Sequence, residues 1–173
     1  MKYSGRDTLL GGLLIALALV LPVLFHALNL GSAFLPMFLP IGVAGYLLAL
    51  PVALAVGMLS PLISALLTGM PPFFPPIAPI MMVEGLALAG IPALLYQRYR
   101  WNLYLTLLIT LFVDRVVALG LVILASKWLD IPEGAMGLSM ILKGIPGVIF
   151  LFVALPPIVR LLEEKMRDAV ILD

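Results

Sequence analysis

The chain has 173 residues, of which 64% are hydrophobic and only 11% are charged, and its net charge is +1. A soluble domain of this length needs far more polar surface, so the composition indicates an integral membrane protein. The chain has no cysteine and a single histidine. This excludes disulfides, thiolate metal sites and cysteine nucleophiles, and we expect neither a metal site nor an enzyme.

Interruptions in the hydrophobic sequence predict six membrane-spanning helices. No Asp, Glu, Lys or Arg occurs from Thr8 to Val83, a stretch of 76 residues with room for three spans of about 20 residues each. Glycine, proline and charged segments set the remaining boundaries. The predicted helices cover residues 8–28, 33–49, 51–69, 78–97, 102–127 and 136–162. The expected fold class is all-α, with one six-helix transmembrane domain over residues 1–173.

The distribution of cations predicts the orientation of these helices. With six spans, both chain ends share one side of the membrane, and the loops on the opposite side hold only Lys127. Cationic loops stay in the cytoplasm, so we expect both termini to be cytoplasmic. The cations on the side of the termini are Lys2, Arg6, Arg98, Arg100, Arg160, Lys165 and Arg167.

The first predicted helix carries two small residues four positions apart, Gly12 and Ala16. Such spacing lets another helix approach closely in lipid, so a partner subunit would dock here. His26 and Asn29 lie at the outer end of the same helix. The third helix repeats the small-residue spacing at Ala53 and Gly57.

The second predicted helix, 33–49, is short and has Pro36 and Pro40 near its start. Proline removes a backbone donor and clashes with the preceding turn. We therefore expect this helix to be kinked or partly re-entrant rather than a straight rod.

Between the third and fourth helices, five prolines occur in the nine positions from Pro71 to Pro79, with Phe73 and Phe74 among them. Proline cannot continue a helix and fixes the chain in extended turns. The segment is either a plain helix breaker or a stiff apolar wall over an outer cavity.

Two charged residues are expected at the same depth in the membrane. Glu84 follows the start of the fourth helix and Lys143 the start of the sixth, each about 10 Å in from the outer face. Because an isolated charge in hydrocarbon costs about 3 kcal/mol, the two should be neighbours. They form either a structural ion pair or the polar lining of an outward-facing ligand pocket. The predicted pocket residues are His26, Asn29, Phe74, Glu84, Trp128 and Lys143.

The fifth predicted helix carries Asp114 and Arg115 near its middle. Adjacent residues are about 100° apart around a helix, so we expect them to point to different partners. They also lie too deep for an outer pocket, and on this interpretation they pair structurally or with backbone carbonyls. Lys127 and Trp128 cap the outer end of the helix.

Two segments resemble the substrate-binding S components of energy-coupling factor (ECF) transporters, which take up vitamins in bacteria. They are FLPMFLPIGVAGYLLALPVALAVGMLSPLISALLTGMPP and APIMMVEGLALAGIPALLYQR, and the likeness is clear over residues 8–100. Its most specific parts are Leu35–Pro40, Ser60–Pro71 and Gly90–Tyr96. The resemblance implies a six-helix protein of the bacterial inner membrane with an outward pocket. It also implies docking, through small residues on the first helix, onto a membrane coupling subunit that works with two ATPases.

The family's usual docking motif is Ala-x-x-x-Ala, and Gly12 and Ala16 match it in kind. The resemblance implies that ATP is used by the partner ATPases, with no cofactor in this chain. An acid and a base in one pocket would suit a small zwitterionic or carboxylate-bearing ligand. Signatures specific for biotin, thiamine or riboflavin are not seen in the sequence.

Two other classes remain open from the sequence. A small multi-span scaffold of the bacterial envelope machinery would use its polar residues to hold helices together and would need no pocket. An intramembrane enzyme would need a catalytic set that a chain with no cysteine and one histidine barely provides.

Overall fold

The computed structural model describes residues 4–27, 34–132 and 142–171, and its regular structure there is entirely helical. Within these described ranges, five helices are long and apolar enough to cross a membrane. The all-α membrane fold expected from the sequence is therefore confirmed. In chain order the elements are α1 (Gly5–Ala27), α3 (Phe38–Leu47), α4 (Leu50–Thr68), α5 (Ile77–Pro92), the π-helix η1 (Ala93–Arg98), α6 (Leu103–Trp128) and α8 (Ile145–Ile171).

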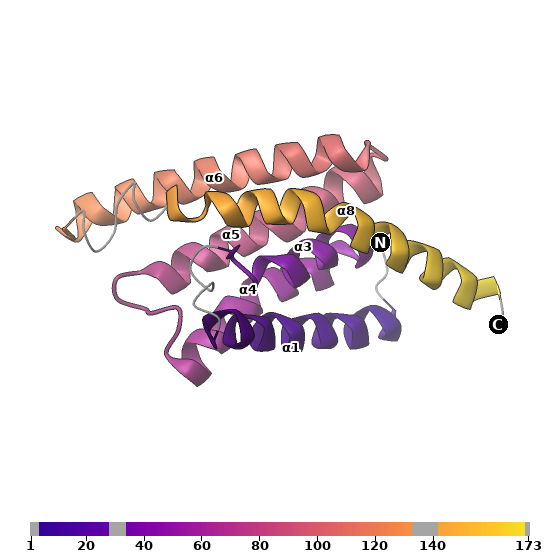
Figure 1. The fold of residues 1–173 in the computed structure, drawn as a ribbon, viewed down its shortest axis with the longest axis horizontal. Coiled ribbons are helices and arrows are strands. Elements are labelled where there is room, and N and C mark those ends of the chain that lie inside the picture. Colours follow the sequence, from indigo (N-terminus) through magenta and orange to yellow (C-terminus); the bar gives the residue numbers. More distant parts are fainter. Residues whose placement is uncertain (1–3, 28–33, 133–141, 172–173) are drawn as a thin grey trace.

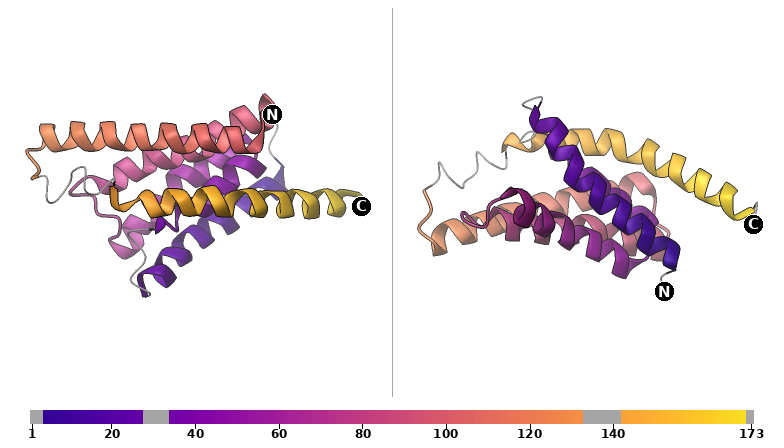
Figure 2. Two further views of the ribbon diagram at one scale, coloured as in Figure 1. Left: turned by 45° about the horizontal axis from the view of Figure 1, so that its top comes forward. Right: turned by 90° about the horizontal axis from the view of Figure 1, so that it is seen from below.

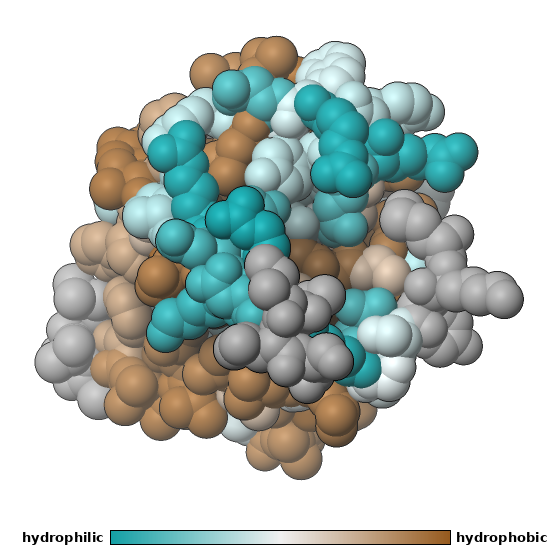
Figure 3. Space-filling view, turned by 90° about the vertical axis from the view of Figure 1, so that its right-hand side faces the viewer, coloured by the Kyte–Doolittle hydropathy of each residue, from teal (hydrophilic) through white to brown (hydrophobic). Residues whose placement is uncertain are grey.

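The helices form one bundle in which α1 begins and α8 ends at the same end (Figure 1). We call this the terminal end. The opposite end, which holds residues 69–76 between α4 and α5, is called the turn end. Hydrophilic side chains gather at the terminal end (Figure 3). Exposed cations there include Arg98, Arg100 and Arg160.

Helix α3 is the short second helix that the sequence predicted. Its 10 residues rise about 15 Å, half of the roughly 30 Å of a bilayer's hydrocarbon core. It lies inside the bundle, with Phe38, Ile41 and Ala44 buried among the other helices. The chain thus has a buried half-length helix in addition to the span-length helices.

Helix α5 occupies the centre of the bundle because small residues let its neighbours approach. A Cβ on Gly85 would run into the carbonyl oxygen of Gly57 in α4, and a Cβ on Gly57 into that of Gly85. A Cβ on Gly45 of α3 would lie 2.6 Å from the carbonyl oxygen of Ala89. The backbones of α4 and α3 therefore touch that of α5, and the small-residue spacing on the third helix indeed marks a close helix contact.

The end of α5 is tied to α3 and α8 through η1. The helix changes to π geometry after Pro92, whose ring interrupts the α-helical pattern. The Gln97 side-chain amide then donates to the carbonyl oxygens of Gly45 and Leu48, at 2.7 and 2.8 Å. These bonds satisfy carbonyl groups that the end of α3 would otherwise leave unpaired. The Tyr96 hydroxyl donates to Glu163 of α8 at 3.1 Å.

The proline-rich turn is held at both of its ends. Gly69 ends α4 in the left-handed region, with φ of 71°. The Ser64 hydroxyl donates to the Met70 carbonyl oxygen at 2.7 Å, and the Ala78 N–H donates to the Pro72 carbonyl oxygen at 2.9 Å. The segment thus ends one helix and starts the next in a fixed geometry.

The last helix, α8, ends nine residues later than predicted, at residue 171 instead of 162. Residues 136–141 lie outside the described part of the chain. The predicted end was wrong because charged residues after Arg160 are good helix formers, and the helix continues through them. Pro146 occupies the first turn of α8, where a proline is tolerated.

Candidate functional site

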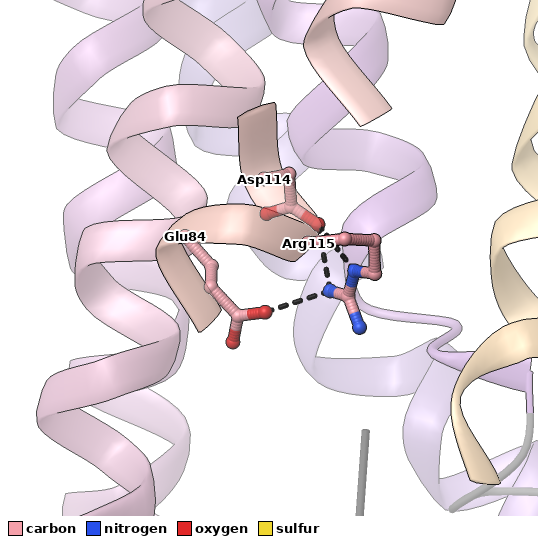
Figure 4. Close-up of polar contacts among 3 residues, drawn as sticks. All are labelled: Glu84, Asp114 and Arg115. Atoms are coloured by element: carbon pink, nitrogen blue, oxygen red, sulfur yellow. Dashed lines mark hydrogen bonds and ion pairs between the residues drawn. The ribbon is translucent and has the colours of Figure 1, made fainter. Parts of the chain in front are cut away.

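A cluster of three charged side chains joins α5 to α6. Arg115 Nη2 lies 2.7 Å from Glu84 Oε1 and 2.6 Å from Asp114 Oδ2, and Arg115 Nε lies 2.9 Å from the same Asp114 oxygen (Figure 4). Asp114 and Glu84 are buried, with 1% and 6% of their surface exposed. One guanidinium therefore bridges two carboxylates within the apolar bundle.

The structure corrects the predicted partners of all three residues. Asp114 and Arg115 were expected to point apart, but the long arginine side chain folds back so that its guanidinium reaches the neighbouring carboxylate. Glu84 was expected to face Lys143, but it pairs with Arg115. Spacing around a helix fixes the directions of Cβ atoms and not the reach of a long side chain.

Depth was the second source of error. Arg115 lies thirteen residues from the end of α6, or about 20 Å, whereas Glu84 lies about 10 Å from the start of α5. The two residues nevertheless lie at the same level of the bundle, because α6 extends beyond α5 at the turn end (Figure 1). Helices of unequal length place residues of unequal predicted depth side by side.

Lys143 lies outside the cluster because α8 begins only at Ile145. Lys143 is in a helical segment that the turn at Gly144 separates from α8, and it is exposed. Its predicted burial opposite Glu84 was wrong for this reason. A contribution of Lys143 to ligand binding remains a prediction.

The cluster retains unused hydrogen-bonding capacity. Asp114 Oδ1 is buried without a hydrogen-bond partner. In Figure 4 the second Glu84 oxygen and the remaining terminal nitrogen of Arg115 point to the same side, and neither bonds to a described residue. The side chain of Arg115 is 20% exposed. The cluster therefore offers a polar group one free Glu84 acceptor and one guanidinium donor, while the unpaired Asp114 oxygen lies behind them.

The other predicted pocket residues are placed less completely. Asn29 and the side chain of His26 lie outside the described part of the chain. Phe74 is 72% exposed on the proline-rich turn, and its neighbour Phe73 is 47% exposed. Neither ring lines the groove described next. The role of Phe74 in ligand binding therefore stays a prediction.

Trp128, 81% exposed, borders an apolar groove of about 300 Å³ between the turn-end portions of α5 and α6. Pro76, Pro79 and Val83 line its other side. Glu84 does not line this groove. Trp128 thus lies at the turn end of the bundle, where the outer end of its helix was predicted. The groove that it borders does not include the charged cluster.

An aromatic cluster at the turn end was missed by the sequence analysis. Phe25 of α1, Phe34 and Phe150 of α8 have ring centroids 5.9–6.2 Å apart. Phe34 is nine residues from Phe25, and Phe150 lies far along the chain, so no helical spacing pointed to the cluster. They join α1 and α8 at the end where Phe73 and Phe74 were expected to form a wall.

The predicted docking residues lie on the outside of α1. Gly12 and Ala16 are both exposed, and a Cβ on Gly12 would meet no atom within 4 Å. Its neighbour Gly11 is buried, and a Cβ there would lie 2.8 Å from Val52 of α4. The helix therefore packs inward through Gly11 and leaves the Gly12 and Ala16 face free. Docking through this face stays a prediction.

An apolar helical bundle with a charged cluster inside defines a multi-pass membrane protein whose polar centre suits binding and transport. The chain belongs to the family of ECF transporter substrate-specific components, whose family model matches residues 9–159. No curated protein and no solved structure matches the chain. The family confirms the resemblance inferred from the sequence and identifies a substrate-binding transporter subunit, not an enzyme.

Proposed function

We propose that this chain captures a vitamin or related micronutrient outside a bacterial cell and delivers it to an ECF-type importer in the inner membrane. The observation that carries this proposal is the Glu84–Arg115–Asp114 cluster inside a chain of the substrate-specific component family. Charged side chains at this depth are costly, and they are characteristic of substrate pathways in membrane proteins. Membership of this family is expected of a transporter subunit and not of a scaffold of the envelope machinery.

The proposed orientation places the turn end outside and the terminal end in the cytoplasm. Its support is the group of exposed arginines at the terminal end, because cationic segments remain cytoplasmic. Labelling of introduced cysteines tests this orientation, because the natural chain has no cysteine that would react as well. A cysteine at Phe74 should react with an impermeant reagent added outside, and one at Asn102 should not. Outside labelling of Asn102 would overturn the orientation.

The proposed partners are a membrane coupling subunit and two ATPases that consume the ATP, with no cofactor bound by this chain. The exposed face of α1 around Gly12 and Ala16 supports docking of the coupling subunit there. Two small residues four apart let a foreign helix approach α1 as closely as α4 approaches α5. The bilayer would otherwise cover this face.

A thermal-shift screen of vitamins and their precursors against the purified protein tests the function. A ligand that binds only the folded state stabilises it by about 2.7 kcal/mol at one hundred times its dissociation constant. We expect at least one compound to raise the melting temperature in proportion to the logarithm of its concentration. A complete absence of stabilising compounds would overturn the proposed capture of a vitamin or related micronutrient.

A further inference from the structure

The charged cluster points to the chemical class of the ligand. We propose that the transported compound carries a cationic nitrogen, of the amine, amidine or protonated heterocycle class, which donates a hydrogen bond to the free oxygen of Glu84 beside the buried carboxylate of Asp114. This inference rests on the proposed function and refines it. It replaces the zwitterionic or carboxylate-bearing ligand that the pairing of Glu84 with Lys143 suggested.

The charge balance of the cluster is the first argument. Two carboxylates share one guanidinium, so the three side chains carry one net negative charge when all are ionised. Lys143, which would have balanced Glu84, is exposed and precedes α8. An uncompensated charge within the membrane is costly, and a ligand cation removes that cost. An anionic ligand would instead add a third negative group beside one arginine.

The free atoms of the cluster are the second argument. Asp114 Oδ1 is buried with no partner, and the second Glu84 oxygen bonds to no described residue. An ionised carboxylate can only accept hydrogen bonds, whereas an ammonium or amidinium group only donates them. The free Glu84 oxygen thus matches a donor that also carries positive charge. Hydrogen bonds between charged groups are the stronger kind.

Arg115 adds a requirement for the rest of the ligand. Its remaining terminal nitrogen points to the same side as the free oxygen of Glu84 (Figure 4). A ligand that pairs with Glu84 therefore gains a second bond if a neutral acceptor, such as a carbonyl oxygen or ring nitrogen, stands next to its cationic group. The cluster would therefore recognise a cationic group through Glu84 and a neighbouring neutral acceptor through Arg115.

The test is a binding panel of vitamins and precursors sorted into cationic, neutral and anionic compounds, measured by thermal shift on the purified full chain. We expect the strongest binder to be cationic. A neutral or anionic strongest binder would overturn this inference and leave the proposed function standing. If no compound binds, both the inference and the proposed function fail.

Two conservative variants sharpen the test. Glu84→Gln should weaken the cationic binder tenfold or more, since a hydrogen bond to a charged group contributes about 1.5–3 kcal/mol. Asp114→Asn removes a negative charge behind the ligand without removing a direct bond, and it should weaken the same binder by a smaller factor. The melting temperature without ligand should stay the same or rise in Glu84→Gln, because the net charge of the cluster disappears. Glu163→Gln, the same change in an acid that bonds to Tyr96 near the terminal end, is the control and should bind normally. Unchanged affinity in both cluster variants would overturn the inference.

Discussion

Helices α1 and α5 have similar apolar compositions but opposite positions in the molecule. Only 11% of the apolar window of α1 is buried, against 50% for α5 with η1. Figure 2 shows α1 crossing one side of the bundle, while α5 runs through its centre. Lipid is as apolar as leucine, so hydrophobicity alone does not decide which helix is enclosed. Close contact with the backbones of neighbouring helices decides which helix is enclosed.

Small residues four apart have different roles in these two helices. In α5, Gly85 and Ala89 receive the backbones of α4 and α3. In α1, Gly12 and Ala16 have the same spacing but face away from the chain. The central helix also carries Glu84, whereas the interior of α1 carries no charge. On this account, α5 with α6 binds the substrate and the outer face of α1 meets the partner subunit.

The largest expected effect comes from filling the contact at the centre. Gly85→Leu places a side chain where the Gly57 carbonyl oxygen lies, so α4 and α5 must separate. We expect a loss of about 3 kcal/mol or more, seen as aggregation or a strongly lowered melting temperature in detergent. Gly12→Leu is the matched control, because open space surrounds that position. Equal damage in both variants would break the distinction between α1 and α5.

Removing the shared cation of the cluster should have an effect of similar size. Arg115→Met leaves Glu84 and Asp114 buried with no partner, which we expect to cost about 3–5 kcal/mol in thermal unfolding. Adding Glu84→Gln and Asp114→Asn to this variant should restore most of the loss, because the buried charge is then gone. Arg160→Met is the control. Arg160 is exposed over the ring of Tyr104, and its loss should cost about 1 kcal/mol.

A smaller effect is expected where η1 meets α3. Gln97→Met keeps the side-chain volume but removes the amide that donates to the Gly45 and Leu48 carbonyl oxygens. Leaving these groups unpaired should cost about 1–3 kcal/mol in thermal unfolding. Arg98→Met changes the exposed neighbouring residue and should stay within about 0.5 kcal/mol. A neutral result for Gln97→Met would show that this link does not hold α3 in place.

The sequence predicted the helices well because proline, glycine and charges interrupt the apolar pattern. The short α3 followed from Pro36 and Pro40, and the end of α4 from Gly69 and the prolines after it. The end of α8 was missed because its charged residues lie beyond the hydrophobic stretch but still continue the helix. A change of solvent does not end a helix whose residues have high helix propensity.

The candidate site was predicted only in part. The cost of a buried charge correctly marked Glu84 and predicted that it would have a partner. The identity of that partner required two facts that spacing does not contain: how far α6 extends beyond α5, and how the Arg115 side chain folds. The phenylalanine cluster at the turn end likewise depends on which helices meet, and α1 could be placed on the outside only once its packing face through Gly11 was known.

The most direct test of the division between α5 and α1 measures ligand binding and cellular uptake in the same two variants. Ala16→Trp should abolish uptake and leave binding by the isolated protein unchanged, because Ala16 is exposed on the face proposed for the coupling subunit. Glu84→Gln should weaken binding tenfold or more and reduce uptake accordingly. Loss of binding in Ala16→Trp, or full binding and uptake in Glu84→Gln, would contradict the account.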